Sequence, residues 1–448
     1  MNVSESCVSE SEIRDLLIGS FHAAVAAVMA ERVLPPQLPP TPAGRTLVLG
    51  AGKAAADMAA CVEAHWPADA PLSGLVITRH GHSLPSPTGE GGGEETRPSR
   101  SQRIQVVEAG HPLPDNAGLT AAQHLLDLAN NTSPNDQVLA LISGGGSSLL
   151  TLPAAGLELA DIRALSSALL NSGAPIADIN CVRKHLSRTL GGRLAAQCRA
   201  PVRVLMISDV TGDDPSVIAS GPFAPDATTF ADALDVLERR QVAVPEPVRR
   251  YLWDGVAGQH PETPKPGAAC FRRVEHRLLA NGRTGLEGAA EYFRNRGITP
   301  VILGDSVSGE AREAAQVFAA LAREIRLHGT PWMPPVALLS GGETSVTVRG
   351  KGRGGRNAEF ELALAIALNG LDRVHALAAD TDGIDGTSDC AGAFIAPDTL
   401  TRAVHLGVSP AAYLADNNAY HFFASLADLV RTGPTRTNAN DYRAILIA

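Results

Sequence analysis

Aromatic residues, paired cysteines and long apolar runs are all scarce in this chain of 448 residues. Aromatics make up only 4%, and no Cys-x-x-Cys pair occurs. The six cysteines are scattered as Cys7, Cys61, Cys181, Cys198, Cys270 and Cys390. This spacing is poor both for a disulfide framework and for a zinc site. The N-terminus lacks a charged stretch followed by an apolar core, and no apolar run could span a bilayer, so we expect a cytoplasmic protein.

The charge balance also excludes some classes of partner. The formal net charge is −9, which argues against a general affinity for nucleic acid or for an anionic membrane. The chain is 44% hydrophobic and 19% charged, close to the average of globular proteins, so it can bury substantial cores. Its length suggests two or three domains.

Short apolar segments alternate with helical patterns along most of the chain, which predicts α/β domains with helices on both faces of a sheet. We predict an N-terminal domain over 1–260 with a parallel sheet, interrupted by a polar surface insertion at 83–102. The stretch GQHPETPKPG, from Gly258 to Gly267, is typical of a linker. A C-terminal α/β domain over 267–448 should have a mixed sheet, because Val336 to Val348 resembles a hairpin.

Glycines and cations concentrate in the segment VALLSGGETSVTVRGKGRGGRN, from Val336 to Asn357. An apolar run reaches a Ser-Gly-Gly turn, and a loop with four glycines and four cations then precedes a helical pattern. Glycines let backbone N–H groups converge on a ligand, and arginines can fork onto phosphate oxygens. We therefore predict an anion site here. Its candidate ligands are Gly341, Gly342, Glu343, Arg349, Lys351, Arg353, Gly355, Arg356 and Asn357.

A second glycine turn, Gly50-Ala51-Gly52-Lys53-Ala54-Ala55, follows an apolar strand and satisfies the dinucleotide pattern G-x-G-x-x-A. The acid expected for the ribose is missing, although Arg79 after the next strand could receive a 2′-phosphate. Lys53 falls at a helix start, where the helix dipole favours anions. Gly50, Gly52 and Lys53 are therefore candidates either for a dinucleotide or for a phosphate or carboxylate.

A third loop, Ser143-Gly144-Gly145-Gly146-Ser147-Ser148, lies between a strand and a helix, and its glycines and hydroxyls suit an oxyanion cradle. It is neither a Walker A loop nor a nucleophile elbow. Arg183 and Lys184 follow an apparent strand end and are also candidate anion ligands.

Acidic residues follow two further strands. Asp209 stands at a strand terminus with Asp214 close behind, and Asp382 belongs to a cluster of acids in the second domain. Ligand sites in open α/β sheets lie beyond the carboxyl ends of strands, where carboxylates can hold Mg²⁺ or accept a proton. We take Asp209, Asp214 and Asp382 as candidate metal ligands. Because Asp214 precedes a proline, it also suits a helix cap, so Asp209 is preferred.

Eight ordered motifs together resemble the class II glycerate kinase family, whose C-terminal module is called MOFRL. They are GAGKAA, EAGHPLPDNAG, LISGGGSSLL, INCVRKHLS, SDVTGDDPSVIASGP, LLSGGETSVTVRGKGRGGRN, DTDGIDGTSDCAGA and GPTRTNAND. The last of these contains Asn440, another candidate ligand. The match covers nearly the whole chain, and the 83–102 insertion removes none of the motifs.

The resemblance implies a Rossmann-like N-terminal domain and ATP-dependent phosphorylation of D-glycerate to 2-phosphoglycerate, with Mg²⁺, in an interdomain cleft. It assigns Lys53 as the essential lysine and Asp209 as the acid that activates the glycerate hydroxyl. Arg356 would stabilise the transferring phosphoryl group. Two alternatives stay open: a hydroxypyruvate reductase using NAD(P)H, because some members of the family carry that label, and a non-catalytic nucleotide or sugar-acid sensor. The oligomeric state, a homodimer included, also stays open.

Overall fold

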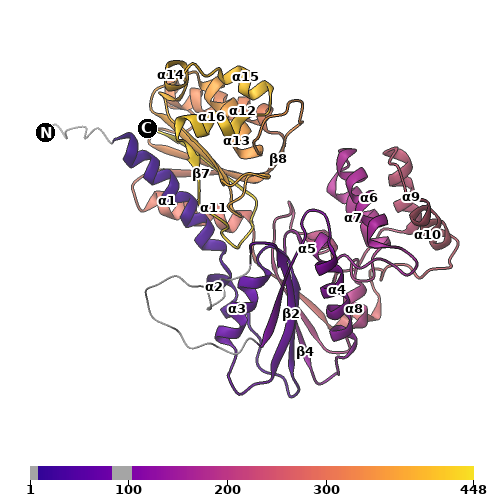
Figure 1. Ribbon diagram of the computed structural model, residues 1–448. Coiled ribbons are helices and arrows are strands. Elements are labelled where there is room, and N and C mark those ends of the chain that lie inside the picture. Colours follow the sequence, from indigo (N-terminus) through magenta and orange to yellow (C-terminus); the bar gives the residue numbers. More distant parts are fainter. Residues whose placement is uncertain (1–8, 83–102) are drawn as a thin grey trace, which may run out of the picture. The chain divides into compact units, whose positions relative to one another are not determined.

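The computed structural model describes residues 9–82 and 103–448, so the predicted insertion at 83–102 lies outside the described residues. The chain forms two compact units. One consists of Ala30–Leu279, and the other combines Ala280–Ala448 with the first helix, α1 (Glu10–Val28). This division differs from the predicted boundaries, because α1 at the start of the chain belongs to the same unit as Ala280–Ala448 (Figure 1).

The unit Ala30–Leu279 is built on a six-stranded sheet with the order β3-β2-β1-β4-β5-β6. The pairings from β3 through to β5 are parallel, as predicted. The strands are β1 (Thr46–Ala51), β2 (Leu72–Arg79), β3 (Ile104–Ala109), β4 (Gln137–Ser143), β5 (Val202–Ile207) and β6 (Val274–Ala280). In this register the carboxyl ends of β1, β4 and β5 lie side by side, so the loops that follow these strands meet at one edge of the sheet.

Alternating side chains of these strands bury both faces of the sheet. Leu47 and Leu49 pack with α4 (Asn116–Asn130) and α8 (Arg193–Gln197), while Val48 packs on the other face with α3 (Ala55–His65). The short helix α2 (Ala30–Val33) joins the second face. Helices on both faces confirm the predicted Rossmann-like arrangement.

Four further helices of this unit share a core of their own. They are α6 (Leu159–Asn171), α7 (Ile176–His185), α9 (Phe230–Arg239) and α10 (Glu246–Val256). The sequence analysis placed a strand end before Arg183, but this segment is helical and belongs to α7. Its apolar residues recur at helical spacing, as Ile179, Val182 and Leu186, and all three are buried in the helical core.

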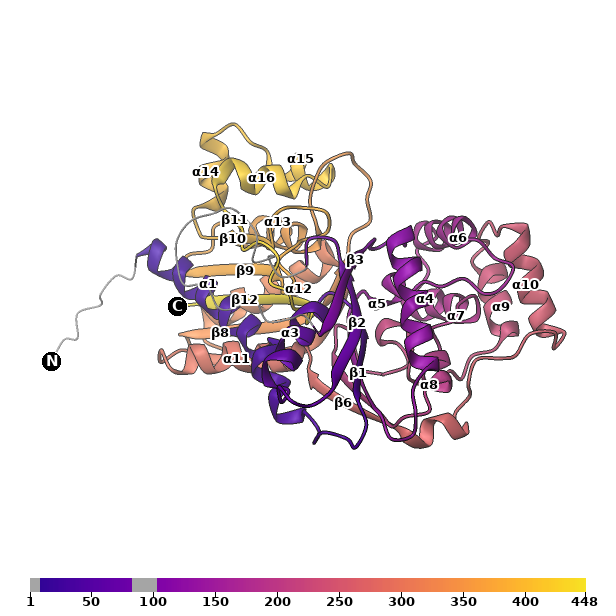
Figure 2. The same ribbon diagram turned by 60° about the horizontal axis from the view of Figure 1, so that its bottom comes forward.

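The second unit contains a mixed sheet with the order β11-β10-β9-β12-β8-β7, which confirms the predicted sheet type. Figure 2 shows β9, β12 and β8 side by side. The strands are β7 (Thr299–Glu310), β8 (Val336–Ser345), β9 (Val374–Asp380), β10 (Gly392–Ile395), β11 (Leu429–Val430) and β12 (Asp441–Ile447). The expected hairpin at Val336 to Val348 is absent from the structure. Instead β8 is one strand, parallel to β7 and antiparallel to β12, and the antiparallel pairings arise between segments distant in sequence.

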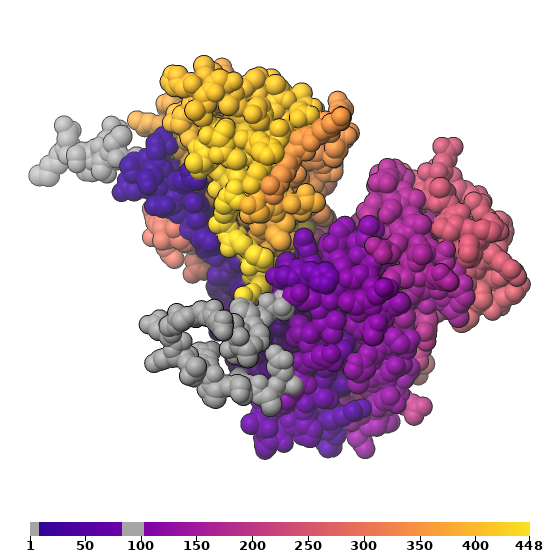
Figure 3. Space-filling model, in the orientation of Figure 1, coloured from indigo at the N-terminus to yellow at the C-terminus, as the bar shows by residue number. Residues whose placement is uncertain are grey.

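Helices cover both faces of this sheet as well. One face packs against α12 (Ala311–His328), α13 (Arg356–Leu368), α14 (Thr399–His405) and α16 (Ala419–Leu426), and α15 (Pro410–Ala415) borders them. The other face packs against α1 and α11 (Gly282–Arg294). The surface of α1, indigo in Figure 3, therefore lies against the yellow C-terminal part of the chain.

Apolar contacts explain why α1 belongs to this unit. A capping box formed by Ser9 and Glu12 starts the helix, and Phe21 is fully buried against β12. The Phe21 ring meets the Tyr442 ring edge-on at 5.9 Å, and the Ser20 and Tyr442 hydroxyls hydrogen bond at 2.7 Å. Without α1, an apolar face of the sheet would be exposed to water.

We expect Phe21→Ala to lower the free energy of unfolding of the C-terminal unit by about 3–5 kcal/mol, because it leaves a cavity between helix and sheet. Denaturant unfolding measures this loss. The matched control is Asp15→Ala on the exposed side of α1, which should stay within about 0.5 kcal/mol of the wild type. Equal effects of the two substitutions would contradict the packing role of α1.

Candidate active site

The turn after β1 is tied to the loop after β4 by its backbone. Gly52 N–H donates to the Ile77 carbonyl at 3.1 Å, and Lys53 N–H donates to the Gly144 carbonyl at 2.9 Å. Ala54 N–H donates to the Ser143 hydroxyl at 3.0 Å. Gly52 has φ +139°, and a Cβ there would lie 2.1 Å from Ser143 Oγ, so only glycine fits. The three N–H groups of the turn are therefore engaged within the protein.

Two side chains, those of Lys53 and His111, lie close to a glycine of the loop Ser143–Ser148. Gly145 has φ +81° and starts the short helix α5 (Gly146–Leu149). A Cβ at Gly145 would lie 3.1 Å from the His111 ring and 3.4 Å from Lys53 Cγ. Lys53 and His111 therefore approach the same glycine at the carboxyl edge of the sheet. Sequence reasoning did not single out His111, although it stands in the motif EAGHPLPDNAG.

The hydroxyl of Ser147 is the first member of a chain of hydrogen bonds. It lies 2.8 Å from the Ser220 hydroxyl, which donates to Asn180 Oδ1 at 2.8 Å. Ala219, Ser220 and Gly221 all have positive φ, at 51°, 58° and 57°. Such strain in non-glycine residues persists only where surrounding contacts enforce it, and it clusters at functional sites. Sequence analysis missed Asn180 and Ser220, because only the fold brings them beside Ser147.

The acids that follow β5 take different positions. Asp209 comes two residues after β5 and is partly buried at the carboxyl edge, as predicted. Asp214 is exposed and accepts a hydrogen bond from Ser216 N–H at 2.8 Å. This contact fits the helix cap that the sequence offered as an alternative to metal binding. Within residues 9–82 and 103–448, no three His, Cys, Asp or Glu side chains form a group that could hold a metal by themselves.

The neighbouring cations Arg183 and Lys184 have separate environments within α7. The buried Lys184 ammonium lies 3.4 Å from Asp226, which Thr228 and Thr263 also contact, so Lys184 is part of a structural ion pair. The predicted role of Lys184 as an anion ligand therefore has little structural support. Arg183 instead lines a pocket, and burial lowers the pKa of its guanidinium.

In the C-terminal unit, the predicted glycine-rich loop is held by the turn Asp416–Asn418. Arg349 and Gly350 N–H groups donate to Asn417 Oδ1 at 2.7 and 3.0 Å. Lys351 and Gly352 N–H groups donate to Asp416, and Arg353 N–H donates to Asn418 Oδ1. The expectation that these backbone groups would converge on a ligand is therefore wrong, because they are already hydrogen bonded within the protein.

The glycines of this loop permit close approach between backbones. A Cβ at Gly350 would lie 2.3 Å from the Asp416 carbonyl oxygen, and one at Gly352 would lie 2.3 Å from Asn418 Cβ. A Cβ at Gly355 would lie 2.3 Å from the Asp385 carboxyl group. No larger residue fits these positions without moving a neighbour. Their sequence signature indicated flexibility, whereas the structure uses them for tight packing.

The side chains of the loop divide into paired and unpaired cations. Arg353 forms an ion pair with Asp389 at 2.9 Å and lies over the Tyr420 ring at 4.0 Å. Arg349 and Lys351 are exposed and have no ion pair within the described part of the chain. The Arg349 and Lys351 side chains are therefore available to an anion.

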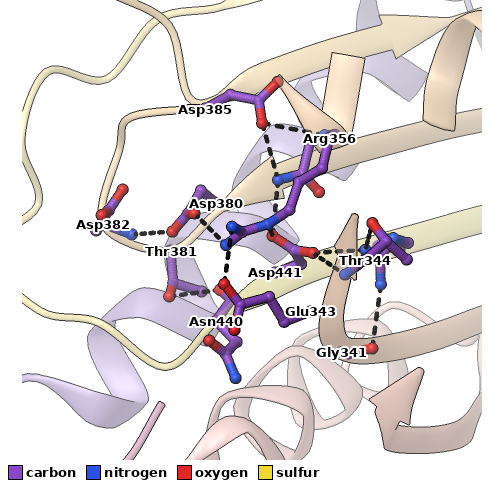
Figure 4. Close-up of polar contacts among 12 residues, drawn as sticks. Gly341, Glu343, Thr344, Arg356, Asp380, Thr381, Asp382, Asp385, Asn440 and Asp441 are labelled. Carbon is purple, nitrogen blue, oxygen red and sulfur yellow. Dashed lines mark hydrogen bonds and ion pairs between the residues drawn. The ribbon is translucent and has the colours of Figure 1, made fainter. Parts of the chain in front are cut away.

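Arg356 begins α13 and is surrounded by three carboxylates (Figure 4). Its Nε donates to Asp441 at 2.7 Å, and its two terminal nitrogens donate to Glu343 at 2.9 Å and Asp380 at 2.7 Å. Burial opposes the charge of Arg356, but these carboxylates outweigh burial and raise its pKa well above the ordinary value. Strands β8, β9 and β12 thus fix one guanidinium at a helix start.

A second layer of contacts supports this cluster. Asp385 caps α13 by accepting Asn357 N–H at 3.0 Å and Ala358 N–H at 2.9 Å. Complete burial raises the pKa of Asp385 to about 6 despite these two bonds. The Asn357 side chain donates to Asp441 at 2.8 Å, and the buried Arg443 donates to the same carboxylate at 2.6 Å. Asn357 therefore positions Asp441, and Arg443 is a residue that sequence analysis missed.

The remaining predicted residues of this unit lie around the cluster. Gly342 has φ +101° and a Cβ there would lie 2.2 Å from the Val307 carbonyl oxygen, so it packs against β7, while Gly341 accepts from Arg443. Asn440 has φ 64°, and its carbonyl accepts from Thr381. The buried Asp382 carboxylate accepts Ile384 N–H at 2.8 Å. Figure 4 shows Gly341, Asp382 and Asn440 around the cluster.

Glycine loops and cations follow strands in both α/β units, an arrangement typical of enzymes that act on anionic substrates. The domain of unknown function DUF4147 matches residues 16–253, and the MOFRL family matches residues 336–441. D-glycerate 2-kinase from Thermotoga maritima is 38% identical, over 96% of this chain and 97% of the relative. A protein of Agrobacterium vitis named putative hydroxypyruvate reductase is 46% identical, over 97% and 94%.

The solved structures agree with the sequence matches. The crystal structure of glycerate kinase from Thermotoga maritima has a TM-score of 0.83 and 37% identity, and the match covers 98% of this chain and all of that one. The chain therefore belongs to the glycerate 2-kinase family with a MOFRL module, as its motifs indicated. No helix in the described part of the chain has the length and hydrophobicity to cross a membrane.

We expect Gly352→Ala to destabilise the C-terminal unit by about 1–3 kcal/mol, because the new Cβ overlaps Asn418. Hydrogen exchange should also accelerate at the N–H groups of residues 349–353, which mass spectrometry can follow. Gly354→Ala is the matched control, because its Cβ would meet nothing closer than 3.4 Å. If both variants exchange like the wild type, the loop is not held by the 416–418 turn.

We expect Arg356→Met to lower the free energy of unfolding by about 3–5 kcal/mol at neutral pH, because it removes the cation paired with the buried Asp380 and leaves Asp441 with Arg443 alone. In the wild type, Arg356 and Arg443 outweigh burial and lower the pKa of Asp441, a stabilisation that is present at neutral pH and lost in acid. The deficit of the variant should therefore shrink as the pH falls and the carboxylates protonate. Denaturant unfolding across pH measures it.

The matched control for this substitution is Arg353→Met. It breaks a solvent-exposed pair with Asp389, which should be worth about 1 kcal/mol or less. A deficit of Arg356→Met that stays constant from neutral to acidic pH would rule out the loss of charge pairing as its cause.

Proposed function

We propose that this chain transfers the γ-phosphoryl group of ATP to D-glycerate and forms 2-phosphoglycerate. The observation that carries the proposal is the approach of Lys53 and the Ser143–Ser148 loop at the carboxyl edge of β1 and β4. It occurs in a chain that matches nearly the full length of a D-glycerate 2-kinase. Phosphoryl transfer mainly requires positioning and neutralisation of charge, and a lysine beside a glycine loop supplies both.

The proposed roles in the first unit follow from position. Lys53 neutralises phosphate charge beside Gly145, and Asp209 accepts the proton of the reacting hydroxyl. Mg²⁺ usually binds through one or two carboxylates together with substrate phosphates, so the acids after β5 suit it without a closed protein cage. Asp209 would hold the metal, which supplies neutralisation of phosphate charge when bound. Asp214 and Asp382 are weaker candidates, because both carboxylates accept backbone N–H groups.

In the second unit, Arg356 is the proposed stabiliser of the transferring group. A guanidinium has five N–H donors, and Arg356 uses one donor for each of Asp441, Glu343 and Asp380. The donors left on its terminal nitrogens are those it can offer to a phosphate oxygen. The carboxylate cluster would hold these donors in a fixed orientation, which lowers the cost of reorganisation during transfer. That one catalytic cycle uses residues of both units stays a prediction.

Reduction of hydroxypyruvate is the second candidate, and the names of relatives at 46% and 47% identity favour it. The β1 turn argues against it. A dinucleotide site needs free N–H groups at this turn for the pyrophosphate. Here Gly52, Lys53 and Ala54 donate to Ile77, Gly144 and Ser143 instead. A non-catalytic sensor is also less well supported, because binding alone does not need Asp209 beside two phosphate-handling loops.

Two parallel assays distinguish these functions. We expect ADP release from D-glycerate and ATP, and no oxidation of NADH or NADPH with hydroxypyruvate. Phosphorus NMR of the product should show the phosphate on the 2-hydroxyl. Oxidation of NADH or NADPH without ADP release would show a reductase and contradict the kinase function. No activity in either assay would favour the sensor.

We expect Lys53→Ala to lower kcat by about 10²- to 10³-fold or more, because the phosphates lose a positioned positive charge. Its melting temperature should stay close to the wild-type value, since the backbone groups of residue 53 keep their bonds. Arg163→Ala removes an exposed cation of α6 and serves as the control with wild-type turnover. A fully active Lys53→Ala enzyme would disprove the role of the lysine.

A further inference from the structure

The pocket beside α7 contains one cation, Arg183. Hydroxyl groups and apolar side chains form the rest of its wall, from α5, α6, α7 and the segments next to them. Ser148, Thr151, Ser166 and Ser187 supply the hydroxyls. Leucine, isoleucine and proline side chains supply the apolar surface. The wall therefore offers a ligand one positive charge, several hydroxyl groups and an apolar surface.

The charge of Arg183 has no counterpart in the described part of the protein. No carboxylate of residues 9–82 and 103–448 forms an ion pair with it, whereas the adjacent Lys184 is paired with Asp226 at 3.4 Å. Arg240, one of the neighbouring arginines in this helical region, is likewise paired, with Asp178 at 2.9 Å. A partly buried guanidinium without a partner is costly, and burial indeed lowers its pKa. An anionic ligand would supply the missing partner.

Two hydroxyls of the pocket are suited to accept hydrogen bonds. Ser148 donates its proton to the Gly145 carbonyl at 3.3 Å, and Thr151 donates its proton to the Ser147 carbonyl at 3.3 Å. Each hydroxyl thus uses its proton within the protein, and its oxygen can still accept a hydrogen bond. An acceptor repels a carboxylate or phosphate but binds an alcohol, so these two groups suit a hydroxyl of a ligand.

The pocket adjoins the residues proposed for phosphoryl transfer. Gly145, which Lys53 approaches, and Ser148, which lines the pocket, belong to one turn around α5. On the other side, Pro114 lines the pocket and His111 approaches Gly145. Two short segments therefore connect the pocket to the surroundings of the Lys53 side chain.

We propose that Arg183 binds the carboxylate of the acceptor substrate, while Ser148 and Thr151 accept hydrogen bonds from its hydroxyls. The inference rests on the proposed kinase function and names the groups of this chain that would bind the acceptor. Arg183 is then the residue that selects an acid over the corresponding neutral polyol. Its partner is the carboxylate of the acceptor, and ATP does not contact it.

Steady-state kinetics of the full chain test the assignment. Arg183→Gln should raise KM for D-glycerate about 10- to 100-fold, as expected for the loss of a charged hydrogen bond, and leave KM for ATP within about twofold. The KM of Arg183→Lys for D-glycerate should lie between those of the wild type and Arg183→Gln, because a lysine keeps the charge but not the forked geometry. Arg188→Gln, at an exposed arginine next along the chain, is the matched control with wild-type values. Preference for D-glycerate over glycerol should drop in Arg183→Gln alone.

A melting curve of each variant separates binding from folding. If Arg183→Gln is folded and its KM for D-glycerate stays within about threefold of the wild type, the assignment is overturned, and an equal rise in both KM values also overturns it. Calorimetric titration of D-glycerate into the protein without nucleotide keeps the test independent of turnover. A wild type that binds D-glycerate through Arg183 but does not phosphorylate it would refute the kinase function alone. Wild-type affinity in Arg183→Gln would refute the carboxylate site alone.

Discussion

The ion cluster around Arg356 is the interaction on which the C-terminal unit depends. A single guanidinium connects the start of α13 to β8, β9 and β12 through Glu343, Asp380 and Asp441 (Figure 4). Buried charges contribute little net stability when paired, but they strongly penalise any arrangement that separates them. The cluster therefore specifies one arrangement of three strands and a helix. The same requirement fixes the orientation of the arginine that we propose to contact the phosphoryl group.

Glycines in both units allow close contact between loops. Gly52 lets the β1 turn approach Ser143, and Gly350 and Gly352 let their loop approach the 416–418 turn. In each case the N–H groups that are often free for a phosphate are bonded to a neighbouring segment of the chain. We therefore propose that side chains recognise the anion, with Lys53 and Arg183 as candidates in one unit and Arg349, Lys351 and Arg356 in the other. A dinucleotide motif in the sequence thus becomes a turn that does not offer its backbone to a pyrophosphate.

Much of the fold could be predicted because its signals are local. The capping box of Ser9 and Glu12, the apolar strands and the alternation of strand and helix depend on neighbouring residues. Apart from the helical segment before Arg183, the errors concern contacts between distant segments. One partner of α1 is β12, more than four hundred residues later, and the antiparallel partner of β8 is also β12. Because these partners lie far along the chain, no local pattern near α1 or β8 predicts them.

For the candidate site, the residue types, their order and the family follow from the sequence alone. Its motifs placed Lys53 and Asp209 just after strands, where α/β folds bind ligands, and Arg356 at the start of a helix. Which of these charges are available follows from the fold. Lys184 is paired with Asp226, whereas the adjacent Arg183 is unpaired, and Arg356 is paired three times while Arg349 is not. The physical reason is that the availability of a charge depends on its distance from its counterions and on its burial. Chain folding sets both, and motif spacing leaves them undetermined.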